Sequence, residues 1–433
     1  MENKQASKLS RQLKRTFCET ALNALGKRVG FCRRRRELTP YRLCLGLVEA
    51  MGVAKVESIA DIQRSYNALS ASNVQYKPLH NQLAKRQFPV FMRGVCAYLL
   101  EQLAVKALRF SPDSAFARFE RIELQDGTSF ALKPSLSQSY PGRFTRVSPA
   151  AVELHVSLDL LTEQPREITL TPDVHSEAQY LPAPESLNNC LVIGDRGYFK
   201  KTYLRDVADH GGFFIIKGKA NMTPTIITAV TDDGVSRKRW ENKSLKHIRA
   251  KLLKTKTMDM DVQWPDKASV IQSRMIVSWS PQTKAYQYLM TNLPRDEFSA
   301  QQVMDAYRLR WQIELLFKEW KSYANLHAFG TSNPAIAEGL IWAALCSAIL
   351  KRYCVLMAQA LTSSPLSTRK AAMCLRHVLP AIFNALLNHS RRLTHHVQQA
   401  LKYLENNAKR AHPKRDALTG RAKLGLVPVS CAA

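Results

Sequence analysis

Residues 299–323 read S-A-Q-Q-V-M-D-A-Y-R-L-R-W-Q-I-E-L-L-F-K-E-W-K-S-Y, and their spacing predicts one helix with two different stripes. Apolar side chains recur at helical spacing and form a face for burial: Leu309, Ile313, Leu316, Phe317 and Trp320. A polar ridge runs beside that face: Tyr307, Arg310, Glu314 and Lys321. At about 100° per residue, the four ridge side chains fall within roughly 60° of one another. Ser299 and Gln302 form a capping box, which predicts where the helix begins.

The polar ridge has two interpretations in the residues themselves. A glutamate can hold a metal ion while a tyrosine, an arginine and a lysine bind phosphate oxygens, which suits phosphodiester chemistry. The alternative is a solvated edge in which Arg310 and Glu314 form an ordinary i,i+4 ion pair worth about 0.3 kcal/mol. The ridge alone leaves both interpretations open.

The spacing Tyr-x2-Arg-x3-Glu-x6-Lys resembles the signature of bacterial insertion-sequence transposases of the DDE class, in the family called insertion sequence four. All four signature positions match, and two acidic motifs precede them in the expected order: Asp126 in D-G-T and Asp195 in D-R-G. Taken alone, the first motif is usually a turn and the second often caps a helix. The resemblance implies a ribonuclease-H-like core, in which two aspartates from strands join a glutamate from a later helix.

The chain between the N-terminal region and the signature contains the strands that such a core needs. Alternating or apolar patterns predict strands at 119–132, 152–161, 166–171, 191–195 and 212–217, with a helix before the last one. In a ribonuclease-H-like sheet the first strand lies beside the fourth, so Asp126 is expected next to Asp195. Three other carboxylates of this region rank lower because they match neither motif: Glu123, Asp159 and Asp173.

The whole chain is predicted to be an α/β protein with four regions. These are a helical N-terminal DNA-binding domain (1–110), a ribonuclease-H-like catalytic core (111–217 and 299–361), a β-rich insertion (218–298) and a helical C-terminal region with a basic tail (362–433). The resemblance also implies an insertion at this point, where an aromatic side chain can stack on a base flipped from the duplex. The candidates are Trp240, Trp264 and Trp279. Trp264 is preferred because Q-W-P predicts an exposed loop.

The N-terminal domain offers two kinds of candidate DNA contact. A basic run is expected to bind phosphates: Arg33, Arg34, Arg35 and Arg36. Residues 58–86 predict two short helices around a polar turn, as in a helix-turn-helix, with these DNA-facing side chains: Lys77, His80, Asn81 and Gln82. A solvated loop and an ordinary helix pair are the alternatives. The resemblance favours DNA binding because the family begins with a helical domain that binds the terminal repeats.

The formal net charge of +28 indicates a polyanionic partner. Residues 1–50 hold twelve Lys or Arg against four Asp or Glu, and residues 389–433 hold nine against two. No basic helix rich in Trp and Phe accompanies these runs, so nucleic acid is favoured over a membrane surface. The stretch after Thr419 is predicted to be disordered without a partner.

Composition predicts a globular protein of the cytoplasm. With 433 residues and 45% hydrophobic content the chain is long enough to bury a large core. The most apolar run, 339–350, is bracketed by charges and falls short of the roughly 20 apolar residues of a membrane span, so a buried helix is predicted. The opening residues lack a signal-peptide pattern. Nine cysteines without a C-x2-C pair indicate neither a zinc site nor a disulfide framework.

The resemblance also implies the chemistry of the site. Two divalent ions about 3.5–4 Å apart activate the water and stabilise the leaving oxygen of a cut strand. Mg²⁺, for which Mn²⁺ can substitute, prefers oxygen ligands. The three predicted metal ligands are Asp126, which bridges the ions, Asp195 and Glu314. Phosphates beside the cut would be positioned by Tyr307, Arg310 and Lys321. Glu319 is a poorer ligand than Glu314, because five residues further on it lies about 140° around the helix axis.

These observations predict a cut-and-paste DNA transposase that excises its element through a hairpin. Its partners would be the terminal inverted repeats, target DNA and a second copy of the chain, the dimer being implied by the resemblance alone. One alternative is a ribonuclease-H-like, structure-specific nuclease without strand transfer. Another is a catalytically silent DNA-binding protein derived from a transposase, against which the complete signature argues. The predicted location is the cytoplasm, at the nucleoid.

Overall fold

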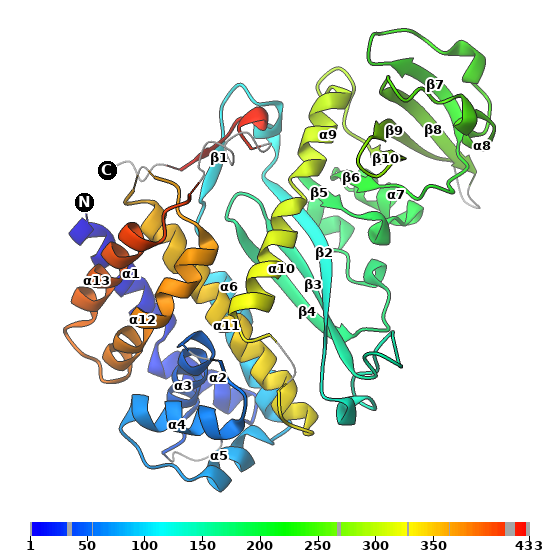
Figure 1. Cartoon of the computed structure of the whole chain (residues 1–433). Coiled ribbons are helices and arrows are strands. Elements are labelled where there is room, and N and C mark those ends of the chain that lie inside the picture. The colour runs from blue at the N-terminus through cyan, green and yellow to red at the C-terminus, as the bar shows by residue number, and fades with distance from the viewer. Residues whose placement is uncertain are drawn as a thin grey trace.

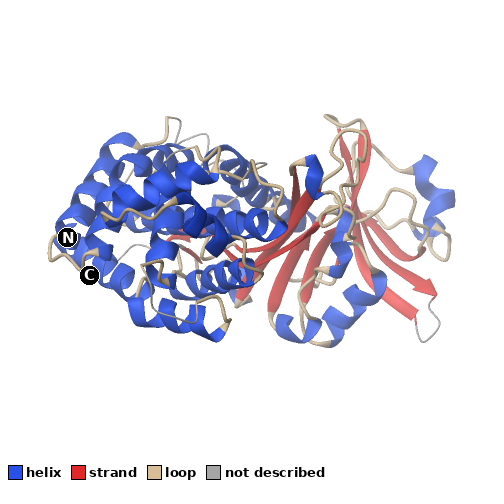
Figure 2. Ribbon diagram, turned by 90° about the horizontal axis from the view of Figure 1, so that it is seen from below, coloured by secondary structure: helices blue, strands red, loops and turns tan. Residues whose placement is uncertain are grey.

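The computed structural model describes residues 2–32, 37–53, 55–265, 270–326, 329–362, 364–411 and 421–429. Figure 1 shows a helical body on one side of the molecule and a long sheet on the other. Figure 2, which views the molecule from below, shows the same division between helices and strands. The chain starts in the helical body, passes through the sheet and returns to the helical body.

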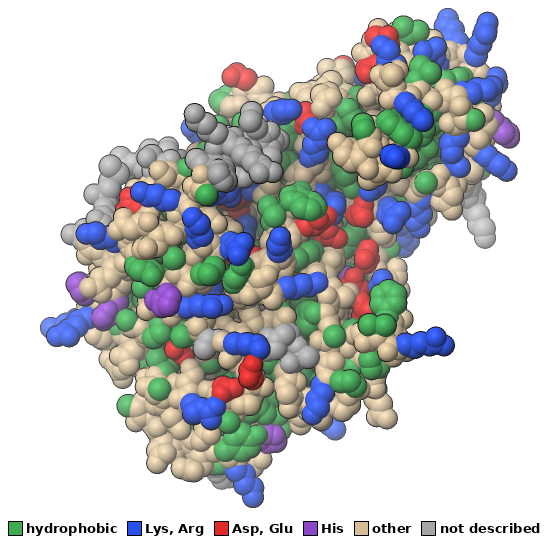
Figure 3. Space-filling model, viewed as in Figure 1, with side chains coloured by type: hydrophobic (Ala, Val, Ile, Leu, Met, Phe, Trp, Pro, Cys, Tyr) green, Lys and Arg blue, Asp and Glu red, His purple; other side chains and the backbone are tan. Residues whose placement is uncertain are grey.

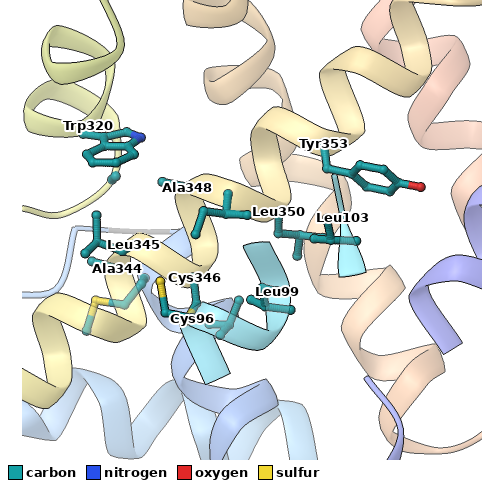
Figure 4. Packing of buried hydrophobic residues seen from close by; sticks show 14 of the residues in the cluster. Cys96, Leu99, Leu103, Trp320, Ala344, Leu345, Cys346, Ala348, Leu350 and Tyr353 are labelled. Atoms are coloured by element: carbon teal, nitrogen blue, oxygen red, sulfur yellow. The ribbon is translucent and has the colours of Figure 1, made fainter. Parts of the chain in front are cut away.

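Helices from both ends of the chain build the helical body. They are α1 (Glu2–Thr16), α2 (Glu19–Arg28), α3 (Pro40–Val53), α4 (Ile59–Ser70), α5 (Tyr76–Leu83), α6 (Gln87–Gln102), α11 (Pro334–Gln359), α12 (Thr368–Leu387) and α13 (Leu393–Asn407). Helix α11 packs against α3 and α6, and α1 packs against α13. Figure 4 shows Cys96 and Leu99 of α6 beside Cys346 of α11. The two ends therefore share one hydrophobic core, while the predicted domain boundaries stay predictions.

Helix α11 is the central helix of this core. It has 26 residues, and both α11 and α12 are long and apolar enough to cross a membrane. The most apolar window of α11 is 94% buried inside the protein, so α11 is a core helix, as predicted. The apolar run of 339–350 lies inside this longer helix, and the charged side chains that follow the run, Lys351 and Arg352, are buried as well. Lys351 donates to the Tyr323 carbonyl oxygen at 3.3 Å, and Arg352 pairs with Glu319 at 3.5 Å.

The sheet has nine strands in the order β4-β3-β2-β5-β6-β10-β9-β8-β7. Its first half consists of β2 (Arg121–Ala131), β3 (Ala151–Asp159), β4 (Gln164–Pro172), β5 (Cys190–Gly194) and β6 (Phe213–Lys217), with α7 (Lys201–Asp209) between the last two. Strands β2, β3 and β4 are antiparallel, whereas β5 and β6 run parallel to β2. Gln125 of β2 lies opposite Gly194 of β5. The predicted adjacency of these two strands is confirmed.

The residues between β6 and the signature helices extend the same sheet. They form β7 (Thr225–Thr231), α8 (Leu245–Ile248), β8 (Met258–Pro265), β9 (Val270–Ser280) and β10 (Ala285–Thr291). Strand β10 pairs antiparallel with β6, with Leu289 opposite Lys217. A second hydrophobic cluster lies between these strands, α7 and α8. The β-rich segment thus continues the central sheet instead of forming a separate layer.

The signature segment forms two helices, α9 (Ala300–Arg308) and α10 (Trp311–Tyr323), with Arg310 in the junction between them, where one helix was predicted. The capping box of Ser299 and Gln302 is present at the start of α9. At the junction, the backbone N–H groups of Leu309 and Arg310 donate to carbonyl oxygens three residues earlier. This tighter turn interrupts the α-helical pattern, a feature that often marks a functional segment.

The C-terminal segment is ordered over residues 421–429, which corrects the prediction of disorder after Thr419. Strand β11 (Leu426–Pro428) pairs antiparallel with β1 (Leu108–Phe110), and Figure 1 shows the two side by side. Arg421 pairs with Glu163 at 2.6 Å and donates to Gln312 of α10 at 2.6 Å. Other parts of the same chain therefore supply the contacts that the prediction assigned to a partner.

Candidate active site

Three carboxylates predicted from the sequence come from three separate elements. Asp126 follows Gln125 on β2, and Asp195 follows Gly194 at the end of β5. Because Gln125 and Gly194 are register partners in parallel strands, the two aspartates leave the same part of the sheet. Glu314 lies in the first turn of α10, which packs against β2. The fold therefore gathers residues that are far apart in the sequence.

Arg310 connects two of these carboxylates. Its Nη1 donates to Asp126 Oδ2 at 2.6 Å, and its Nη2 donates to Glu314 Oε1. The guanidinium is largely buried, with 16% of the side chain exposed. The i,i+4 pair of the alternative interpretation therefore exists, but it also binds a residue 184 positions away. It belongs to an internal cluster and not to a solvated helix edge.

Asp195 is held by a different pair of side chains. The Tyr307 hydroxyl donates to Asp195 Oδ1 at 3.1 Å, and Lys217 Nζ lies 3.8 Å from the same oxygen. Burial, and next the Asp195 carboxylate, raise the pKa of Tyr307, so this hydroxyl stays protonated and able to donate. The sequence analysis missed Lys217, because a lysine that ends a strand carries no motif of its own.

The charge of Asp126 is sensitive to its surroundings. Burial raises the pKa of Asp126 to about 6, although the Arg310 guanidinium offsets part of that rise. Burial disfavours the ionised form, whereas a nearby cation favours it. The ionised state of Asp126 at neutral pH therefore depends on positive charge placed beside it.

The donor atoms fit a hard divalent cation, since three carboxylates supply the oxygen ligands that such ions prefer. In the part of the chain that the structure describes, no three His, Cys, Asp or Glu side chains lie close enough to hold an ion. Arg310 accounts for this spacing, because its guanidinium bonds to both Asp126 and Glu314. Ion binding by these carboxylates requires the Arg310 side chain to turn away.

Two further charged side chains of α10, Lys321 and Glu319, lie in contrasting environments. Lys321 is exposed about two helical turns beyond Glu314. Glu319 is 10% exposed and pairs with Arg352 of α11 at 3.5 Å. Glu319 lies on a different side of the helix from Glu314, as predicted, and α11 packs against α10 there. Its role in the structure is to join two helices.

A second group of acidic side chains lies behind the two aspartates and was missed by the sequence analysis. A Cβ atom at Gly127 would lie 2.7 Å from Glu153 Oε1 and 3.6 Å from the Tyr198 hydroxyl. Burial and the neighbouring Glu177 raise the pKa of Glu153 to about 7. Among the described residues, the buried Tyr198 hydroxyl has no hydrogen-bond partner. Glycine beside Asp126 was the only sequence signal, since it allows such a close approach.

A cleft of about 2580 Å³ opens beside the carboxylates. Tyr307 and Arg310 border it from the site, the β9–β10 turn borders it from the sheet, and α12 and residues 421–429 border it from the helical body. Among the described residues of its border Glu163 is the one acidic residue, and it pairs with Arg421. The other basic residues along it are Lys8, Lys106, Lys217, Arg308, Arg369, Lys370, Arg410 and Lys423. Figure 3 shows acidic side chains between the helical body and the outer strands, with Lys and Arg around them.

Trp264, the tryptophan that the sequence analysis preferred, does not lie in an exposed loop as predicted. Trp264 lies on β8 opposite Ile271 and is 7% exposed. Its ring centroid lies 6.3 Å from that of Phe199. The Q-W-P motif predicted a loop, but Pro265 is the last residue of β8, and Trp264 points into the core like Val262 two positions earlier. Trp264 is therefore a core residue.

The other tryptophans differ in access to the cleft. Trp240 is buried beneath the β-rich segment, whereas Trp279 borders the cleft. Trp279 is one of the three candidates of the sequence analysis, and its side chain is half-buried. Trp311, which it did not consider, is 57% exposed and borders the same cleft from α10. Two tryptophan rings are thus available there, beside that of Tyr307.

The N-terminal candidates are placed only in part. The arginine run lies outside the described residues: Arg33, Arg34, Arg35 and Arg36. Helices α4 and α5 form the predicted pair, with Lys77 and Asn81 exposed and His80 half-buried on α5. The Gln82 amide instead donates to the Phe31 carbonyl oxygen at 3.1 Å. Gln82 is half-buried and has a partner within the chain, and its role as a DNA-facing side chain stays a prediction.

Comparison with known proteins gives one family. A family model described as "Transposase DDE domain" matches residues 118–350. The transposase for insertion sequence element IS231B of Bacillus thuringiensis subsp. berliner is 21% identical and covers 93% of this chain and 92% of its own length. The transposase for insertion sequence element IS1151 of Clostridium perfringens is 21% identical over 74% of each chain. A solved piggyBac transposase synaptic complex with hairpin DNA aligns with 90% of this chain and 84% of that chain, at 11% identity and a TM-score of 0.46, too weak a likeness to support an argument.

Proposed function

The chain belongs to the family with a transposase DDE domain, and from this membership we propose that it moves an insertion sequence by cut-and-paste transposition. As a DDE transposase it is an enzyme that cleaves DNA and transfers strands. The observation that supports the proposal is the meeting of Asp126, Asp195 and Glu314 from β2, β5 and α10 around Arg310 and Tyr307. The proposal also specifies the route, which is cut-and-paste excision through a hairpin.

We assign the first five strands of the sheet and helices α9 to α11 to a ribonuclease-H-like catalytic core. The strand order β4-β3-β2-β5-β6, with three antiparallel strands followed by two parallel ones, supports this assignment. The β-rich segment then extends the core from β6 outward. The helices before β1 are proposed to bind the terminal repeats, through α4 and α5.

Enzymes of this family generally use divalent metal ions. We propose two Mg²⁺ ions, for which Mn²⁺ can substitute, held by Asp126, Asp195 and Glu314, because hard ions prefer carboxylate oxygens. When bound, such ions activate water and stabilise charge on the leaving oxygen. The protein contributes the ligands, and the Tyr307 hydroxyl keeps Asp195 oriented. Arg310, which binds Asp126 and Glu314 in this structure, would have to turn away for these two carboxylates to hold an ion.

The released Arg310 guanidinium becomes available for a phosphate of the strand beside the cut. Tyr307 and the exposed Lys321 extend the same ridge and position further phosphates, as do Lys217 and the basic border of the cleft. For a hairpin intermediate, Trp279 takes the stacking role, since its ring borders the cleft and that of Trp264 does not. The enzyme acts as a homodimer on terminal repeats and target DNA, in the cytoplasm at the nucleoid.

A pair of glutamine variants tests this proposal on purified protein with a labelled element end. Glu314→Gln is expected to reduce Mg²⁺-dependent cleavage by a factor on the order of a thousand, because a metal ligand is lost. Glu319→Gln is the matched control on the same helix and should keep most of the cleavage. The reverse result would contradict the assignment. Wild-type products that include nicks but never hairpins or joined molecules would favour the structure-specific nuclease instead.

A further inference from the structure

Residues 237–256, which connect β7 to β8, form a strongly basic segment on the β-rich part of the sheet. They hold nine Lys or Arg and a single Glu. The sequence analysis located the charge excess at the two chain ends, and this internal excess is a separate feature. The side chains of Lys243, Lys246 and Lys251 are exposed, as are those of Lys238 and Arg239. Figure 3 shows many Lys and Arg side chains on the outer end of the molecule, where α8 lies in Figure 1.

The exposed charges of this basic segment are not neutralised by the protein. Within the described ranges, no carboxylate forms an ion pair with Lys243, Lys246 or Lys251. Lys256, at the end of the segment, does pair with Asp233, at 2.8 Å. Like charges that gather on one surface without counter-charges repel each other, so a bound anion would stabilise them.

The apolar side of the basic segment is already occupied. Leu245, Ile248 and Leu252 are buried in the cluster between the sheet, α7 and α8. A membrane-binding helix needs an apolar face that is free to enter the lipid. Only Leu253 among the large apolar residues of the segment is exposed, at 36%. The segment therefore offers charge without a lipid-binding face, which favours a nucleic acid over a membrane surface.

One end of the basic segment reaches the cleft beside the carboxylates. Lys254 Nζ lies 4.5 Å from the centroid of the Trp279 ring, and the Tyr286 hydroxyl donates to the Leu252 carbonyl oxygen at 2.7 Å. Trp279 itself borders the cleft. Positive charge thus continues from the candidate active site, past Trp279, to the exposed lysines.

We propose that the basic segment binds the phosphate backbone of duplex DNA that adjoins the strand held at the carboxylates. This inference rests on the proposed function, because it extends the path of the same substrate. The contacts are made by flexible ammonium groups on the surface, so they bind any sequence and position the duplex without reading bases. The segment thereby holds DNA beyond the cut, while specificity lies elsewhere in the chain.

A pair of triple variants tests this inference by fluorescence titration of the full-length protein with a labelled DNA duplex of unrelated sequence. The triple variant Lys243→Gln, Lys246→Gln and Lys251→Gln should bind about tenfold or more weakly than the unaltered protein near 0.1 M salt. The slope of log affinity against log salt should fall by about two to three, since each lost phosphate contact removes about 0.9. The variant with Arg at the same three positions should restore affinity and slope.

Unchanged affinity and slope in the Gln variant would overturn the inference. An equal loss in the Arg variant would overturn it as well, because the effect would then come from the fold of the segment. Tighter binding of duplex RNA than of duplex DNA by the unaltered protein would also contradict it. The titration is done with EDTA, so it does not depend on metal-dependent cleavage. Absence of cleavage by the unaltered protein would count against the proposed function and leave the binding result intact.

Discussion

The carboxylate site and the basic segment are both charged, but their charges are organised in opposite ways. At the site, Asp126, Asp195 and Glu314 come from distant parts of the chain and are paired with Arg310 and Tyr307. In residues 237–256 the charges are neighbours in sequence, and Lys243, Lys246 and Lys251 are exposed and unpaired within the described ranges. Burying the charges of the site costs desolvation free energy, and only the folded structure can hold them together. The charges of the basic segment need only an exposed surface. The comparison separates a centre for chemistry from a surface for attachment.

Replacing Arg310 should have the largest effect on the stability of the metal-free protein. In EDTA, Arg310→Gln is expected to lower the free energy of unfolding by about 3 kcal/mol, because two partly buried carboxylates lose their cation. Mg²⁺ should recover part of this loss, since ions can replace the guanidinium. Urea unfolding with and without Mg²⁺ measures both. If Mg²⁺ does not stabilise the variant more than the unaltered protein, Asp126 and Glu314 do not share an ion.

The buried Glu153 behind the site should make stability depend on pH. Its pKa is raised to about 7 by burial and by Glu177. The stability that protonated Glu153 contributes is therefore present below its unfolded pKa, near pH 4.5, and is lost as pH rises through 7. Glu153→Gln, which stays neutral, should remove roughly 2 kcal/mol of this pH-dependent loss between pH 5 and pH 7.5. Equal pH dependence of unfolding in both proteins would show that Glu153 is ionised throughout.

The smallest stability effect is expected in the basic segment. Lys246→Gln should change the free energy of unfolding by less than about 0.5 kcal/mol, because the side chain is exposed and unpaired within the described ranges. Thermal unfolding of the variant and the unaltered protein measures this difference. A larger loss would mean that the lysine has a structural partner, and the contrast between the two regions would then fail.

Local patterns predicted much of the fold. The capping box, the strands with Asp126 and Asp195 and the burial of α11 follow from periodicity, whereas the adjacency of the two strands was implied by the family resemblance. Other features depended on contacts between distant residues. The alternation around Trp264 was hidden by the neighbouring proline, and residues 421–429 are held in place by contacts with β1 and Glu163. The break between α9 and α10 likewise had no signal in the spacing of the ridge.

The sequence by itself determined which side chains could carry the chemistry. The spacing of Tyr307, Arg310, Glu314 and Lys321 and the two acidic motifs identified them through the family resemblance, whereas helix periodicity alone showed only that the four ridge residues share one face. Only the tertiary structure decided how those groups meet. Strand register and the packing of α10 on β2 place Arg310 between two carboxylates and Tyr307 on the third. Such long-range placement depends on the packing of the whole core, which no local pattern encodes.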